Sequence, residues 1–189
     1  MGHSQAEKAK SRERILAEAA RQIRQNGLES VSVGTLMKSV GLTHGGFYGH
    51  FDNREALLAS ALERALLEGE AKVGAQAPGD APRFASIVRE YLSKSHRDAR
   101  DSGCAVAALS ADVARAGERP REVMSGHVET FIDTMAAALG GDEERAIMAV
   151  CAMVGALTLS RVVTDPARSD TILRAVRSHL AELDPARAA

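Results

Sequence analysis

Cysteine and aromatic residues are scarce in this sequence. Its 189 residues include two cysteines, no tryptophan and an aromatic content of only 3%. Cys104 and Cys151 are too few and too far apart for a disulfide framework or a zinc site, so we expect reduced thiols. The sequence also has no cofactor-binding loop and no cluster of metal ligands, and we therefore expect neither a cofactor nor a metal.

Strand patterns and targeting segments are missing as well. No segment alternates apolar and polar residues for long enough to predict a β-strand. The first ten residues, MGHSQAEKAK, lack the apolar core of a signal peptide, and we expect no run of about 20 apolar residues that could span a bilayer. These absences predict an all-α, soluble protein in the cytoplasm, without membrane contact.

Charge is nearly balanced but unevenly distributed. The formal net charge is -1. Residues 1–60 hold eight Lys or Arg against six Asp or Glu, a balance of +2, so the remaining residues hold 16 against 19, a balance of -3. This mild asymmetry permits a nucleic-acid contact in the first third of the chain but does not by itself predict one.

Apolar residues recur at helical spacing along most of the chain. From Ser11 to Asn26 they lie on one face of a helix, and a glycine follows its end. A helix of about two turns is expected after Ser32, which is placed to cap it, and a longer one from Asp52, with Glu55 completing a capping box. After a linker at 74–82, further helices are expected at about 82–97, 103–116, 120–139, 142–163 and 168–183, which makes about nine.

The segment GLTHGGFYGHF, from Gly41 to Phe51, concentrates four glycines, two histidines and three aromatic residues. A short helix, a tight turn at Gly41 and a second short helix make a helix-turn-helix. The second helix, from Thr43 to His50, has eight residues and spans roughly 12 Å at about 1.5 Å per residue, close to the width of the DNA major groove.

The glycines of this segment indicate close approach to another molecule. Gly45 and Gly46 would each cost a helix interior about 1 kcal/mol relative to alanine, so a purely structural helix has reason to avoid them. In the groove they bring the backbone near base edges, where Thr43 and His44 can donate hydrogen bonds. On the opposite flank we expect phosphate contacts from Tyr48, His50 and Arg54, while Phe47 and Phe51 face the core.

Other interpretations of the segment fit less well. Tyr48 could be a partly buried aromatic residue whose hydroxyl is satisfied locally. His44 and His50 could bind a metal, but no cysteine or acidic residue stands at a usable spacing. The glycines match neither a dinucleotide-binding loop nor a P-loop, and no G-x-S-x-G motif accompanies the HGG sequence.

Residues 15–62 resemble the DNA-binding domain of the TetR (tetracycline repressor) family of bacterial regulators. The resemblance rests on Ile15, the alanine pair at 19–20, Gly27, the Ser-Val pair at 32–33, the Gly-Leu-Thr at 41–43, the aromatic and histidine pattern at 47–51, and Arg54-Glu55-x-Leu57-Leu58. Gly34, Met37 and Gly49 depart from residues usual in the family. The resemblance implies a TetR-like fold, with a helix-turn-helix domain at 1–62 that includes a tail at 1–10, and a ligand-binding and dimerisation domain at 63–189.

The resemblance also implies a homodimer on palindromic double-stranded DNA and a small-molecule effector that lowers DNA affinity. By position it assigns phosphate contacts to Thr43, Tyr48, His50 and Arg54, and base contacts to His44, Gly45 and Gly46. We also expect Ser32 to contact DNA. The family analogue of the segments at 142–163 and 168–183 is a four-helix bundle formed by two subunits, and an ordinary pair of core helices is the alternative.

The middle helices hold the candidates for a ligand site. These are the polar or soft side chains Tyr91, His96, Cys104, Met124, His127 and Phe131, although any of them could be a core residue. Cys104 stands at a predicted helix amino terminus, which favours thiolate, so a redox or electrophile sensor is one interpretation and a buried inert thiol the other. Cys151 lies among apolar residues and is interpreted as structural.

The function predicted from these patterns is a transcriptional regulator, most simply a repressor that a small molecule releases from DNA. An enzyme is the first alternative, but the sequence offers no paired nucleophile and base and no metal cluster. A helical interaction protein that no longer reads DNA is the second alternative. Binding to duplex DNA with a steep salt dependence would exclude it.

Overall fold

The computed structural model describes residues 5–74 and 84–184, and every regular element in those ranges is helical. The first part contains α1 (Gln5–Asn26), η1 (Leu28–Ser30), α2 (Val33–Ser39), η2 (His44–Gly49) and α3 (Arg54–Gly74). The second contains α4 (Phe84–Tyr91), α5 (Lys94–Asp98), α6 (Ala105–Val113), α7 (Glu118–Ala138), α8 (Glu143–Val162), α9 (Pro166–Leu180) and η3 (Ala181–Leu183). The predicted all-α fold is confirmed.

The amino-terminal helices close around one apolar cluster. The face of α1 predicted from helical spacing is buried, with Ile15, Ala19 and Ile23 fully covered, and α1 packs along α3. Because α1 begins at Gln5, it includes most of the segment that we predicted as a tail. The buried face therefore anchors a helix that extends further toward the amino terminus than its apolar pattern alone indicated.

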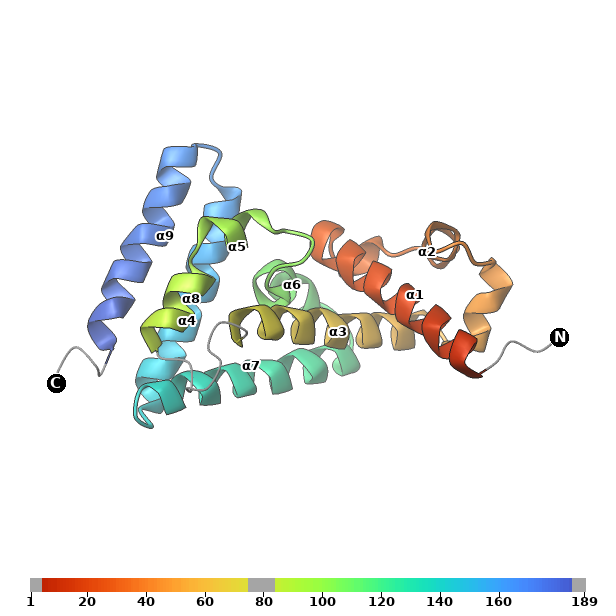
Figure 1. The fold of residues 1–189 in the computed structure, drawn as a ribbon, viewed down its shortest axis with the longest axis horizontal. Coiled ribbons are helices and arrows are strands. Elements are labelled where there is room, and N and C mark those ends of the chain that lie inside the picture. The colour runs from red at the N-terminus through yellow and green to blue at the C-terminus, as the bar shows by residue number, and fades with distance from the viewer. Residues whose placement is uncertain (1–4, 75–83, 185–189) are drawn as a thin grey trace.

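Helix α3 connects the two parts of the molecule. In Figure 1 it runs from the end that holds α1 and α2 toward α6 and α7, and it contacts α1, α6 and α7. Leu57 and Leu62 are fully buried near its start, and Leu66 is 2% exposed further along. The predicted domain boundary at residue 62 thus falls inside one continuous helix.

The carboxy-terminal part is built on long helices. Helix α8 packs against α7 on one side and α9 on the other, while α6 lies against α3, α7 and α8 (Figure 1). The short α5 is fastened to α9 by Arg97, whose Nη1 atom donates to Asp170 Oδ1 at 2.7 Å and to Ser169 Oγ at 2.9 Å. Helix α6 is therefore surrounded by α3 from the first part of the sequence and by α7 and α8 from the second.

Two predicted helix boundaries were wrong. The helix expected at about 82–97 is two helices, because Ser93 caps α5 by accepting a hydrogen bond from the His96 amide at 3.1 Å. Helix α3 begins at Arg54, and Asn53 rather than Asp52 caps it, since its Oδ1 atom accepts from the Ala56 amide at 2.8 Å. The first two residues of the helix expected at about 82–97 and most of the linker at 74–82 lie outside the described residues.

Helix α8 leaves apolar side chains uncovered. Ile147, Met148, Leu159 and Val162 are exposed, and Cys151, which we interpreted as structural, is exposed too. By length and composition α8 could span a membrane, which the sequence interpretation did not anticipate, although its other side packs as a core helix against α7 and α9. Packing within the subunit explains the apolar residues on the buried side of α8 but not those on its exposed side.

Candidate nucleic-acid interface

The turn between α2 and η2 has the geometry of a helix-turn-helix. Gly41 adopts φ 71°, a left-handed conformation that favours glycine. The Leu42 amide donates to the Met37 carbonyl at 2.8 Å and the Gly41 amide donates to the Lys38 carbonyl at 3.0 Å, so the end of α2 is closed by its own turn. Arg14 of α1 donates to the Val40 carbonyl and ties the turn to α1.

The second helix is a 3₁₀-helix rather than the α-helix whose rise we used to predict its length. Thr43 caps it as expected, its Oγ1 atom accepting from the Gly46 amide at 3.3 Å. Three of the six residues in η2 are glycines, which weakens α-helical propensity. Six residues at about 2.0 Å rise still span roughly 12 Å, so the helix keeps the reach expected of it.

The inner side of η2 is held by aromatic packing. Phe47 is 1% exposed, and its ring stacks on that of Phe51 with the centroids 5.6 Å apart. The guanidinium of Arg12 lies 5.0 Å from the Phe51 ring centroid, a cation–π arrangement from α1. Both phenylalanines therefore belong to the core, and they fix which side of η2 faces outward.

The outer side of η2 carries the residues predicted to meet bases. Thr43, His44, Gly45 and Gly46 are all exposed. A Cβ atom at Gly45 would have nothing within 4 Å, and Gly45 has no positive φ. Gly45 therefore has no internal packing or conformational reason to be glycine, and the same is true of Gly49.

Tyr48 and His50 occupy different environments on the flank of η2. Tyr48 is 68% exposed, which argues against a partly buried aromatic residue, and it meets the Phe47 ring edge to face at 5.3 Å. The Nδ1 atom of His50 is buried and has no hydrogen-bond partner among the described residues. Burial lowers the pKa of His50, and the positive charges of Lys8 and Arg12 lower it further.

Arg54 is partly engaged within the protein. Its Nη1 atom donates to Glu29 Oε2 at 2.9 Å, its Nη2 atom to the Glu29 carbonyl at 3.0 Å, and its Nε atom to the Val31 carbonyl at 3.1 Å. These bonds fasten η1 to the start of α3. Ser32 is exposed at the amino end of α2 and makes no side-chain capping bond, unlike the cap we predicted.

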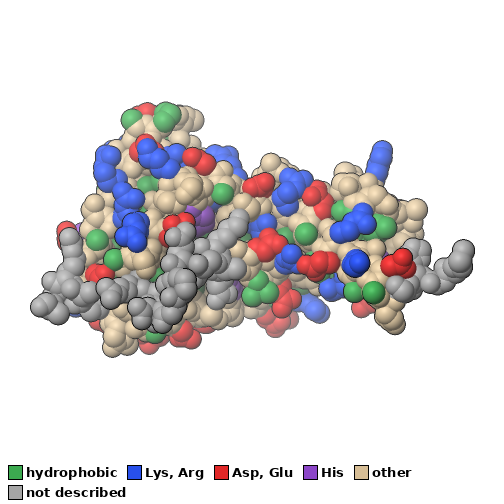
Figure 2. Space-filling view, in the orientation of Figure 1, with side chains coloured by type: hydrophobic (Ala, Val, Ile, Leu, Met, Phe, Trp, Pro, Cys, Tyr) green, Lys and Arg blue, Asp and Glu red, His purple; other side chains and the backbone are tan. Residues whose placement is uncertain are grey.

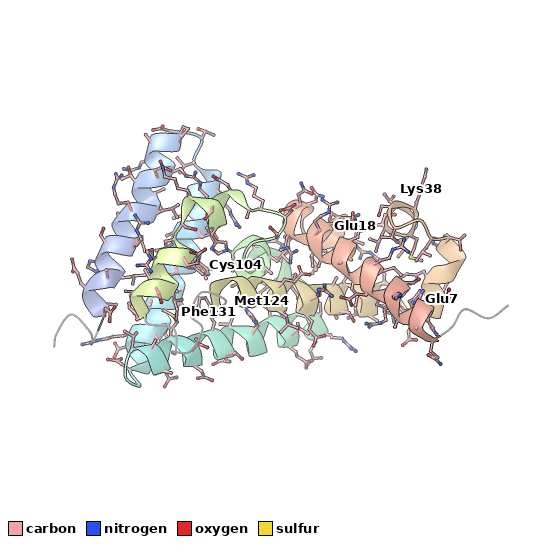
Figure 3. All side chains as sticks on the ribbon, viewed as in Figure 1. Glu7, Glu18, Lys38, Cys104, Met124 and Phe131 are labelled. Atoms are coloured by element: carbon pink, nitrogen blue, oxygen red, sulfur yellow. The ribbon has the colours of Figure 1, made fainter. Side chains whose placement is uncertain are left out.

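Basic side chains that we did not assign to the site lie near it. Lys38 is exposed at the end of α2 and points away from the body of the molecule in Figure 3. Lys8 and Arg12 are exposed on α1, close enough to His50 to influence its pKa. Figure 2 shows basic and acidic side chains intermixed over this end of the molecule, without one continuous basic surface. Lys8 and Arg12 could be connected with the site only from the folded structure, because α1 is far from His50 in the sequence.

The second candidate site is a cavity of about 140 Å³ between α3, α4, α6 and α7. Four of the predicted ligand residues line it, Tyr91, Cys104, His127 and Phe131, together with Leu66, Gly69, Ile87, Ala105, Val106, Thr130 and Thr134. His96 and Met124 do not line it. His96 instead accepts a hydrogen bond from the Cys104 amide. Met124 is buried, and Ser110 Oγ contacts its sulfur at 3.8 Å.

Polar contacts connect the cavity residues to one another. The Tyr91 hydroxyl donates to Cys104 Sγ at 3.0 Å, and the Cys104 amide donates to His96 Nε2 at 3.0 Å. His96 Nδ1 lies 2.7 Å from the Tyr91 carbonyl oxygen, and the two rings meet edge to face. Burial raises the pKa of Tyr91 well above its ordinary value, and the neighbouring Cys104 raises it further, so the hydroxyl keeps its proton.

Comparison with known proteins adds an independent line of evidence. Residues 15–61 match the family model described as bacterial regulatory proteins, tetR family. The HTH-type transcriptional regulator AcrR of Shigella flexneri is 34% identical over 89 residues, which is 46% of this chain and 40% of that regulator, so the match spans less than half of AcrR.

Solved structures resemble the whole fold. A TetR transcriptional regulator from Chloroflexus aurantiacus gives a TM-score of 0.80 at 19% identity, covering 94% of this chain and 95% of that one. The reduced form of NemR from E. coli gives 0.73 at 21% identity, covering 90% and 95%. The matched segment at 15–61 and the helix-turn-helix geometry are those of the DNA-binding domain of the TetR family, and the solved structures show that the chain has the fold of TetR regulators.

Proposed function

We propose that this protein is a cytoplasmic transcriptional repressor, not an enzyme, which binds a palindromic DNA operator as a homodimer and is released by a small molecule. The observation that carries the DNA-binding part is the outer face of η2. It presents Thr43, His44 and Gly45 outward, and nothing inside the protein requires the glycine. A groove-inserted helix explains that glycine, because a bare backbone can approach base edges closely.

The proposed contacts divide into base readout and phosphate binding. We assign base contacts to His44, Gly45 and Gly46, and phosphate contacts to Thr43, Tyr48 and His50. Ser32, at the exposed amino end of α2, and Arg54, three of whose five N–H groups donate to Glu29 and Val31, are weaker candidates for phosphate. Lys38 adds an exposed charge on the neighbouring helix.

The proposed dimer uses α8 and α9. Met148, Cys151, Leu159 and Val162 recur at spacings that place them on one exposed side of α8, and a partner subunit would cover them. Dimerisation matters because one helix with few base contacts binds weakly, whereas two modules about 34 Å apart match one turn of DNA. Accordingly, we divide the chain into a DNA-binding domain at 1–62 and a ligand-binding and dimerisation domain at 63–189.

The proposed effector site is the cavity between α3, α4, α6 and α7. Tyr91, Cys104, His127 and Phe131 line it, and α3 runs from the DNA-binding part to the cavity wall. An occupied cavity can lower DNA affinity only if the ligand binds the DNA-competent arrangement less well. Coupling of this kind is typically about 1–3 kcal/mol.

The test is selection of bound duplexes from a random pool with the purified protein, followed by salt titration on the selected sequences. We expect a palindrome with half-sites about one helical turn apart, and an affinity that falls steeply with salt. Absence of enrichment, with a folded dimer present, would instead favour the helical interaction protein.

Variants separate the two kinds of contact. Tyr48→Phe and His50→Ala should weaken binding to all sequences alike and reduce the salt slope, while His44→Ala should change the preferred base. Arg89→Ala is the control, because Arg89 is exposed on α4, in the carboxy-terminal part of the molecule rather than on the interface. Unchanged affinity in Tyr48→Phe and His50→Ala would remove both residues from the phosphate contacts.

A further inference from the structure

A second pocket, of about 190 Å³, lies between α5, the end of α8 and the start of α9, away from the η2 face (Figure 1). Most of its lining residues are polar or charged, and they include three arginines, Arg97, Arg100 and Arg161. Asp98 is the one acidic residue among the described residues that line it. We propose that this pocket binds a small, doubly charged oxyanion, namely inorganic phosphate or the phosphate group of a small molecule.

The charges on α5 are already balanced by carboxylates. Arg97 Nε donates to Asp98 Oδ1 at 2.8 Å, and Arg97 Nη1 donates to Asp170 Oδ1 at 2.7 Å. Lys94 pairs with the other oxygen of Asp170 at 2.5 Å. These two cations and two anions leave no net charge, so an excess of positive charge in the pocket comes from the remaining arginines.

Arg100 and Arg161 supply that excess. Arg161 is partly buried, and its Nε and Nη2 atoms donate to the Arg97 and His96 carbonyls, both at 3.0 Å. Its Nη1 atom takes part in neither bond. Arg100 is exposed, and its Nη2 atom donates to the Arg161 carbonyl at 3.1 Å. All three bonds go to neutral oxygen atoms, so they leave both positive charges in place.

This arrangement is unfavourable without an anion. Burial lowers the pKa of Arg161, and the like charge of Arg100 lowers it further, while Cys104, Tyr91 and Asp98 act in the opposite direction. Burial and a neighbouring cation both disfavour the charged form of a base. An anion between the two guanidinium groups would offset both effects.

The chemistry of the lining favours phosphate. A guanidinium presents paired N–H donors that match two oxygens of a phosphate or carboxylate group. Phosphate carries a charge of about -1.5 to -2 at pH 7, which matches two unbalanced arginines better than a monoanion does. Thr164, exposed on the turn after α8, offers a hydroxyl donor at the same pocket.

The pocket is large enough and accessible. One water molecule needs about 10–15 Å³, so about 190 Å³ holds an ion of several heavy atoms with some of its water. Arg100 and Thr164 are exposed, so the ion reaches the pocket from solvent. Once bound, the ion would connect the segment that follows α5 with the end of α8 and should stabilise the folded protein.

The experiment is a calorimetric titration of the full-length protein with sodium phosphate at neutral pH, with sodium chloride holding the ionic strength constant. We expect one phosphate to bind per chain with a dissociation constant of about 1 mM or tighter, which a few charge-assisted hydrogen bonds supply. The melting temperature should rise with phosphate concentration. Absence of saturable binding would overturn the inference.

Arg100→Gln locates the ion. Arg100 is exposed, whereas loss of Arg161 would also release the end of α5, so Arg100 is the better position for a variant. Arg100→Gln should weaken phosphate binding about tenfold and keep the parent's melting temperature without phosphate. Arg174→Gln is the matched control, because it removes the same charge from an exposed position on α9 outside the pocket. Equal losses in the two variants would show general attraction to positive charge and refute a defined site.

Other ions identify what the pocket recognises. Acetate, a monoanion, should bind at least tenfold more weakly than phosphate, and equal affinity would contradict the choice of a dianion. Glycerol phosphate distinguishes the two sources of the phosphate group, since tighter binding than inorganic phosphate would indicate a phosphorylated small molecule and equal binding the free ion.

The proposed DNA interface is the competing location for a phosphate ion. Phosphate binding that is lost in His50→Ala but unchanged in Arg100→Gln would place the ion at η2 and overturn the inference. None of these titrations contains DNA, and the inference goes beyond the proposed function. A protein that binds phosphate in the arginine pocket but selects no duplex would therefore refute the proposed function alone.

Discussion

The outer face of η2 and the cavity differ in how the chain assembles them. The residues of the η2 face, from Thr43 to Tyr48, are nearly consecutive and exposed. The cavity collects Leu66, Tyr91, Cys104 and Phe131 from four helices, and three of these four side chains are buried. On η2, substitutions should therefore affect either DNA binding or stability but not both. In the cavity, a substitution at a buried lining residue should affect ligand binding and stability together.

Neighbouring residues on η2 provide the strongest test of that separation. Phe47→Ala should lower the free energy of unfolding by about 3–5 kcal/mol, because it removes a side chain that is 1% exposed and stacked on Phe51. Tyr48→Ala, at a site 68% exposed, should change it by less than about 0.5 kcal/mol. Urea unfolding of both variants decides the point, and equal losses would show that the two sides of η2 are not independent.

Arg24 joins α1 to α3 and to the segment before α6, and its loss should be the next largest effect. Its side chain is 3% exposed and donates to Glu68 Oε2 at 2.8 Å and to the Asp101 carbonyl at 2.7 Å. Arg24→Met should destabilise the fold by about 2–4 kcal/mol, since it removes the donor of three hydrogen bonds, one of them to the carbonyl of the buried Ala65 at 3.3 Å.

Arg21→Met is the control for that prediction. Arg21 stands on the same helix and pairs with Glu18 at 2.7 Å, but its side chain is 42% exposed. Exposed pairs contribute little, so this variant should lose no more than about 0.5 kcal/mol. Thermal unfolding of the two variants side by side would contradict the assignment if Arg21→Met were the more damaging.

Gly45→Ala should separate stability from DNA affinity most directly. The added methyl group has open space around it and removes a glycine from a helical segment, so stability should stay level or rise by up to about 1 kcal/mol. DNA affinity should fall by about 1 kcal/mol or more, because the methyl group keeps the backbone away from the base edges.

Gly126→Ala is the matched glycine. Gly126 also has nothing within 4 Å of an added Cβ atom, but it lies on α7, away from η2. Its replacement should stabilise the protein similarly and leave DNA affinity unchanged in a binding titration. If both variants reduced affinity equally, the effect would be conformational rather than local to the interface.

The same contrast explains what the sequence could predict. The helix-turn-helix was predictable because its signals are local: Gly41 at the turn, Thr43 as a cap, and Phe47 and Phe51 at spacings that face inward. The 3₁₀ geometry of η2 was not predicted, since we interpreted its glycines as allowing the backbone to approach DNA and did not consider their effect on the type of helix. The Asn53 cap was missed because Asp52 offers a competing match to the same pattern.

The cavity was only partly predictable because it depends on packing between distant segments. Tyr91 and Cys104 were selected as polar or soft residues in apolar helices, and the fold brings them within hydrogen-bond distance. Met124 has the same character but lies outside the lining, and His96 lies behind the sulfur. No sequence pattern distinguishes these cases. The apolar segment at 142–163 was expected to meet a partner subunit, but periodicity does not tell which of its residues the subunit itself covers.

The smallest effect we predict is a pair of opposing pH dependences at His50. Its pKa in the folded protein is lowered, chiefly by burial and also by Lys8 and Arg12. Between this lowered pKa and the ordinary value of about 6.5, the unfolded chain binds more protons than the folded protein. The contribution of His50 to stability is therefore fully present above pH 6.5 and declines as pH falls through that window.

A phosphate near His50 should have the opposite effect on DNA binding, because it favours the protonated ring. DNA affinity should therefore rise as pH falls through the same window. His50→Gln should flatten both profiles, measured by urea unfolding and by DNA titration from pH 5 to 8. Two profiles of the same sign would place His50 away from phosphate, whereas opposite signs would show that one residue on the flank of η2 links the fold and the interface.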